Sequence, residues 1–92
     1  SQKIKFGLSM LSLTHLDESV RLKAVKNTYK DININVFKRI KVLIKDEKSE
    51  KVRDSMLVLM NIYQLNDKDP SIRIKAIKEL NGNLEPIVKN KL

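Results

Sequence analysis

The residues with the clearest capacity for chemistry are lysines that recur at helical spacing. Eight of them lie in three predicted helices: Lys23, Lys26, Lys30, Lys38, Lys41, Lys45, Lys75 and Lys78. Side chains three, four or seven positions apart share one face of an α-helix. Ammonium groups at this spacing can follow a phosphate backbone and release its counterions without reading the base sequence. The pattern therefore predicts a candidate phosphate- or partner-contacting surface.

The overall charge agrees with such a surface but has a second explanation. The formal net charge is +8, which attracts nucleic acid, anionic membrane or acidic protein. Lysine outnumbers arginine 15 to 4, a bias that an AT-rich genome or a thermophile's surface also produces. The same lysines would also decorate the solvated side of any amphipathic helix. Composition alone leaves both interpretations open.

No catalytic or metal-binding pattern accompanies the lysines. His15 is the single histidine, cysteine is absent, and no acidic residue stands at a metal-ligand spacing from His15. Gly7 and Gly82 are isolated, so there is no glycine-rich phosphate loop, and Gly82 after Asn81 predicts a helix C-cap. We expect a non-enzymatic protein with no cofactor and no metal, in which His15 lies in a turn or on the surface.

Aromatic residues are too few to form a base-stacking platform. Tryptophan is absent, and Phe6, Tyr29, Phe37 and Tyr63 are the four aromatic side chains. Phe37 and Tyr63 fall on apolar helix faces, which predicts that they belong to the core. Single-stranded nucleic acid is usually held by exposed aromatics between basic residues, a pattern not found here.

The elements that position these residues are predicted to be helices. Polar punctuation divides the chain into helices at about 3–14, 17–30, 34–46, 49–65, 69–81 and 84–91, with weak strand-like alternation only at 32–36. Residues 1–92 suffice for one domain, and 41% hydrophobic with 33% charged residues is typical of a soluble helical protein. No apolar run reaches the roughly 20 residues of a membrane span. No signal peptide is recognisable, and the lack of cysteine fits a cytoplasmic protein.

Three helix openings are nearly identical. Each has an N-cap residue, a β-branched residue three positions later and then an arginine: Asp17, Val20 and Arg21; Ser49, Val52 and Arg53; Asp69, Ile72 and Arg73. Pro70 occupies the first helical position of the third copy, where its missing N–H costs nothing. Three of the four arginines thus share one repeat position, which predicts a structural role for Arg21, Arg53 and Arg73.

The opening D-x-x-(V/I)-R-x-x-A-(V/I) resembles the second helix of HEAT repeats, especially the short type of phycobilisome-lyase-like proteins. The resemblance covers roughly residues 8–80. It implies an α-α superhelix whose arginines pair with acidic residues of adjacent turns, with these candidates: Asp17, Asp46, Asp67 and Asp69. It also implies a protein partner, since HEAT proteins are binding scaffolds.

The repeat spacing departs from that family. The intervals from Val20 to Val52 and from Val52 to Ile72 are 32 and 20 residues, and 20 residues are too few for a helix pair. The helix at 49–65 must therefore serve two repeats, and its nearly continuous apolar surface predicts burial on all sides. The expected fold is all-α: a HEAT-like superhelix or a compact bundle of five to six short helices with one atypical repeat.

Two functions follow as expectations. The first is a protein–protein interaction adaptor or assembly subunit. The alternative is sequence-nonspecific DNA or RNA backbone binding through the lysine stripes. Neither end of the stack is obviously capped, so self-association into a homo-oligomer is also an expectation.

Overall fold

The computed structural model describes the backbone of residues 10–91 and the side chains of residues 10–82. Its elements are α2 (Glu18–Asn27), the 3-10 helix η1 (Thr28–Lys30), α3 (Ile34–Leu43), α4 (Glu50–Gln64) and α5 (Pro70–Lys91). No strand occurs in this described part, so the prediction of an all-helical fold is confirmed and the alternation at 32–36 forms none. The predicted helix at 3–14 lies largely outside the described residues, with 10–12 helical.

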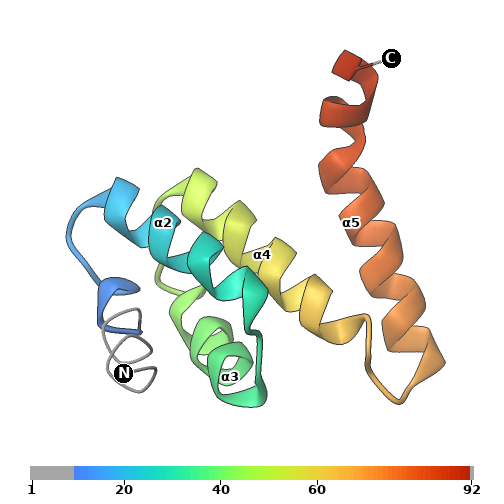
Figure 1. Ribbon diagram of the computed structural model, residues 1–92, viewed down its shortest axis with the longest axis horizontal. Coiled ribbons are helices and arrows are strands. Elements are labelled where there is room, and N and C mark those ends of the chain that lie inside the picture. The colour runs from blue at the N-terminus through green and yellow to red at the C-terminus, as the bar shows by residue number, and fades with distance from the viewer. Residues whose placement is uncertain (1–9, 92) are drawn as a thin grey trace.

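The chain turns back after each short helix, and α4 takes the central place (Figure 1). α2 and α4 lie side by side, α3 packs against α4, and α5 leaves the end of α4 at a steep angle (Figure 1). α4 contacts α2, η1, α3 and α5, which confirms its predicted central position. Burial on all sides was wrong, however, because Leu57 is 41% exposed.

One apolar core lies between α2, α3 and α4. Its fully buried members are Leu13, Ala24, Val25, Val36, Ile40, Val52, Met56 and Leu59. In α3 the buried residues Val36 and Ile40 are four positions apart, and Leu43 is packed against the same cluster, as expected for one face of a helix. The described side chains of α5, at 70–82, contribute no member to this cluster, and Ala76 is the only one of them that is fully buried.

Three hydroxyl groups between the helices donate hydrogen bonds to backbone carbonyls. The buried hydroxyls of Thr28 and Ser55 donate to the carbonyls three residues earlier, at 2.6 and 2.7 Å. The Tyr29 hydroxyl donates to the Ser55 carbonyl at 2.9 Å and ties η1 to α4. Burial raises the pKa of the Tyr29 phenol above its ordinary value. These bonds satisfy three hydroxyls that helix packing removes from water.

Phe37 and Tyr63 pack against each other between α3 and α4. Their ring centroids are 4.6 Å apart with an interplanar angle of 58°, a tilted arrangement that suits aromatic quadrupoles. Both residues are half-buried rather than fully enclosed. The prediction that they belong to the core was therefore only partly right, because neither is a member of the buried cluster.

The last helix corrects the predicted boundary at Gly82. Instead of helices at 69–81 and 84–91, one helix runs from Pro70 to Lys91. A helix-ending glycine takes a positive φ, and none of the described glycines does so. No side chain lies within 4 Å of a Cβ placed on Gly82, so no tertiary contact interrupts the helix there. No helix among the described residues is long and apolar enough to cross a membrane.

Candidate interaction surfaces

The repeated helix openings form one local structure three times. The residue two positions before each N-cap accepts the cap's backbone N–H through its own side chain. The acceptors are His15 Nδ1 for Asp17, Glu47 Oε2 for Ser49 and Asp67 Oδ1 for Asp69, at 3.0, 3.0 and 2.9 Å. Each cap then accepts an amide of the first turn, from Ser19, Val52 and Ser71 respectively. The predicted caps are thereby confirmed.

The repeat arginines close the same three turns. The Nη1 atoms of Arg21, Arg53 and Arg73 donate to the carbonyls six residues earlier, at 2.9, 2.9 and 2.6 Å. Those carbonyls belong to the same residues whose side chains accept the cap amides: His15, Glu47 and Asp67. Each turn therefore holds its helix entrance from both sides. This geometry supports a structural role for the repeated arginines.

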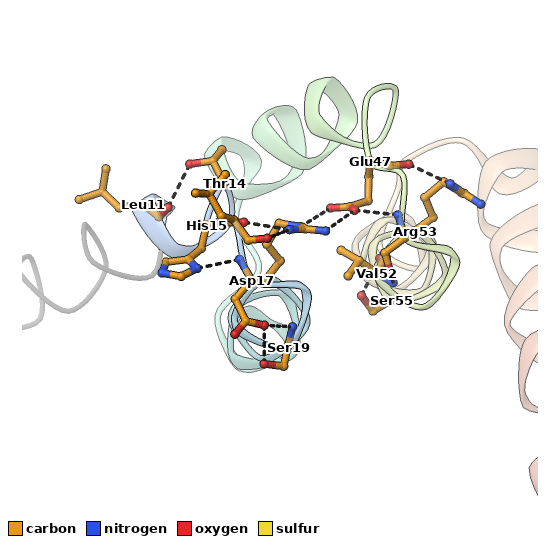
Figure 2. Close-up of polar contacts among 12 residues, drawn as sticks. Leu11, Thr14, His15, Asp17, Ser19, Glu47, Val52, Arg53 and Ser55 are labelled. Atoms are coloured by element: carbon orange, nitrogen blue, oxygen red, sulfur yellow. Dashed lines mark hydrogen bonds and ion pairs between the residues drawn. The ribbon is translucent and has the colours of Figure 1, made fainter.

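Glu47 joins the first turn to the second (Figure 2). Its carboxylate accepts Arg21 Nε at 2.9 Å and Arg21 Nη2 at 3.0 Å, a bidentate pair. The side chains are 18% and 5% exposed. Burial is the strongest influence on the Glu47 carboxyl and opposes its ionisation, but the bonds from Arg21 and the Ser49 amide outweigh it. The pKa of Glu47 therefore lies below its ordinary value.

Sequence reasoning missed Glu47. The expected acidic partners were Asp17, Asp46, Asp67 and Asp69, yet Arg21 bonds the residue beside Asp46, and Arg53 and Arg73 bond carbonyl oxygens. Asp17 and Asp69 instead accept the hydroxyls and amides of Ser19 and Ser71. These bonds lower the pKa of both aspartates. The missed signal was the spacing of two positions between Glu47 and its cap, which recurs at His15 and Asp67.

An open pocket of about 290 Å³ lies between the first two turns. Arg21, Glu47 and His15 are among its lining residues, and their bonds are those just described. His15 is exposed, as predicted, and its Nδ1 is used by the Asp17 amide. No group of three potential metal ligands occurs among the described residues. The pocket is thus built from groups already used in holding the turns.

The eight candidate lysines are all exposed, but the structure does not gather them into one patch. Lys23 and Lys26 lie opposite the buried face of α2, and Lys30 ends η1. Lys38 and Lys41 lie opposite the buried face of α3, and Lys45 lies in the turn that follows it. Both buried faces point into the same core, so the two lysine sets point away from it in different directions. Lys75 and Lys78 lie on α5, apart from both.

Large apolar side chains are exposed beside the second lysine set. Ile34 is 52% exposed and Val42 is 57% exposed. With Lys38, Lys41 and Lys45 they make up what we name the α3 outer face. Positions 34, 38 and 41 follow each other at intervals of four and three residues, which places them along one stripe of α3, and Lys45 follows in the turn after the helix. The lysines of this face were predicted from the sequence, whereas its exposed apolar residues were not.

A second exposed apolar pair lies on α5. Ile74 and Ile77 are 52% and 49% exposed, whereas Ala76 between them is buried against the rest of the molecule. Within residues 70–82, the face of α5 that carries Ala76 is therefore covered, whereas the side of Ile74 and Ile77 is exposed.

Comparisons with known protein families, with characterised proteins and with solved structures gave no match to this chain.

Proposed function

We propose that this protein is a non-enzymatic, HEAT-like helical-repeat module that binds another protein, as an adaptor or assembly subunit. The observation that carries the proposal is the exposure of paired apolar side chains on two helices, Ile34 with Val42 and Ile74 with Ile77. Exposed apolar groups beside charged ones are typical of protein interaction surfaces rather than of phosphate-binding tracks.

The repeat geometry supports the HEAT-like part of the proposal. Three helix entrances share caps, acceptors and arginine bonds, and α2 and α4 lie side by side with their caps 32 residues apart. In such a scaffold, side chains on the outward helix faces can differ while the buried residues and the turns stay the same. The polar groups of the turns are engaged in holding the scaffold, which leaves binding to the outward faces.

The test is affinity capture with nuclease-treated extract, comparing the natural chain with two double variants, Ile34→Ser/Val42→Ser and Ile74→Ser/Ile77→Ser. We expect a protein that the natural chain enriches and that at least one double variant loses while remaining folded. Enrichment of nucleic acid alone, removed by the nuclease, would contradict the proposal. Sedimentation of the same samples shows whether the Ile74 and Ile77 pair serves a second copy of the chain.

Sequence-nonspecific nucleic-acid binding is the second candidate. Its support is that all eight lysines are exposed and that none forms an ion pair among the described residues. This candidate requires affinity for duplex DNA that falls steeply with salt. It also requires a large loss of binding on charge reversal of the lysine set that contacts the DNA, with Lys38, Lys41 and Lys45 as the first set to test. Equal binding at low and high salt would remove it.

A further inference from the structure

The α3 outer face combines two chemistries that a phosphate backbone does not use together. Its lysines carry positive charge, and no acidic residue occurs from 32 to 45, so nothing on this helix neutralises them. Ile34 and Val42 add exposed branched carbon to the same side of the helix. A duplex backbone offers anions but no apolar surface to cover these two side chains.

The spacing of the apolar pair sets the size of a matching partner. Ile34 and Val42 are eight positions apart, which is about 12 Å along a helix at 1.5 Å per residue. Lys38 and Lys41 stand between them, and Lys45 follows within one further turn. A second helix laid along this face would need two apolar residues about two turns apart, with carboxylates between and beyond them.

We propose that the α3 outer face docks an acidic amphipathic helix of a partner protein. This inference rests on the proposed protein-binding function and gives it a surface and a partner chemistry. Charge complementarity carries the choice of occupant: opposite charges steer the encounter and fix the register, while burial of Ile34 and Val42 holds the complex. Lys23, Lys26 and Lys30 are an internal control, because they have the same spacing and no large apolar residue from 18 to 30 is exposed. The nearest exposed one is Leu16, which precedes the N-cap of α2.

The test uses a defined probe, a capped helical peptide with two leucines eight residues apart and glutamates between and beyond them on the same face. A matched peptide carries serine in place of both leucines. Binding is measured by fluorescence anisotropy against the natural chain and three variants: Lys38→Glu/Lys41→Glu/Lys45→Glu, Ile34→Ser/Val42→Ser, and Lys23→Glu/Lys26→Glu/Lys30→Glu. Circular dichroism confirms that each variant is folded.

We expect the leucine peptide to bind and the serine peptide to bind at least about tenfold more weakly. The α3 charge reversal and the Ile34/Val42 variant should each weaken binding by about tenfold or more. The α2 charge reversal should change it by less than about threefold, through its long-range field alone.

Three results would overturn the inference. One is no peptide binding at millimolar concentration, and another is an equal loss from the α2 and α3 reversals. The third is tighter binding of duplex DNA or of phosphatidylserine vesicles, unaffected by Ile34→Ser/Val42→Ser. If captured protein is retained by the α3 variants but lost with Ile74→Ser/Ile77→Ser, the docking inference fails while the proposed function stands. If no protein is captured at all, the proposed function itself fails.

Discussion

The body formed by α2, α3 and α4 differs from α5 in how it is held. Eight fully buried apolar residues join the body, and the Arg21–Glu47 pair ties its two turns together. α5 enters through the same kind of turn, with Arg73 bonded to the Asp67 carbonyl, but among the described residues it buries only Ala76 completely. The same local motif therefore begins a helix in both regions. The regions differ in how many apolar side chains each helix buries against its neighbours.

Stability and the proposed binding rest on different side chains. The caps, turn acceptors and arginines of the repeat hold the helix entrances, whereas exposed apolar side chains lie on outward helix faces: Ile34, Val42, Ile74 and Ile77. Substitutions of buried residues should therefore change unfolding, and substitutions on the outward faces should change binding.

The largest effect is expected in the core of α4. Leu59→Ala removes a fully buried side chain and should lower the free energy of unfolding by about 2–5 kcal/mol. Leu57→Ala, two positions away and 41% exposed, is the matched control and should cost less than about 1 kcal/mol. Urea denaturation followed by circular dichroism measures both. Equal losses would contradict the assignment of the core.

The next effect is expected at the link between the first two turns. Glu47→Gln keeps the shape but removes the charge that Arg21 pairs with, and should cost roughly 2 kcal/mol. Asp46→Asn, at the exposed neighbouring position, should have little effect. A larger loss of unfolding free energy for Asp46→Asn than for Glu47→Gln would indicate that Asp46 is the partner of Arg21.

The ionisation of Glu47 should make the free energy of unfolding depend on pH. The pKa of Glu47 is lower in the folded protein than its ordinary value of 4.5, so the folded state binds the proton less readily than the unfolded state. Its stabilising contribution is complete above pH 4.5 and is lost as the pH falls through the folded pKa. Urea midpoints between pH 7 and pH 3 should fall less steeply in Glu47→Gln. Parallel curves would refute this origin.

A smaller effect of opposite sign is expected at Asn61 of α4. This residue is 4% exposed, and its Nδ2 has no hydrogen-bond partner within the described part of the chain. A buried donor without a partner costs free energy, so Asn61→Leu should leave stability unchanged or raise it by about 1 kcal/mol. A loss of more than about 1 kcal/mol would show that the amide makes a necessary contact.

The smallest effect is expected in α5. Gly82 lies inside a continuous helix with open space around its Cβ position. Gly82→Ala should therefore increase helicity and favour folding by roughly 0.5–1 kcal/mol. Destabilisation by alanine would indicate a helix-ending conformation at this position. The body should be unaffected in either case, as amide hydrogen exchange in α2 would show.

Local features of the fold were predictable because they depend on neighbouring residues. The caps at Asp17 and Ser49 and the helix after Asp69 follow from side chains within a few positions. The same local reasoning failed at Gly82, since the residue type permits a helix end without requiring one.

Long-range features were not predictable from these patterns. Arg21 meets Glu47 across 26 positions, and the choice of Glu47 over Asp46 depends on how the turn before α4 lies against the first turn. The exposure of Ile34 and Val42 likewise depends on which side of α3 the core covers. The lysines of the candidate surface could be found from spacing, but their apolar neighbours required the packing.

The most direct measurement is a two-dimensional ¹H–¹⁵N NMR titration of the natural chain with the acidic leucine peptide. We expect the largest amide shifts on the α3 outer face, at Ile34, Lys38, Lys41, Val42 and Lys45. Shifts concentrated on the lysines of α2, or on the turns of Arg21, Arg53 and Arg73, would contradict this expectation.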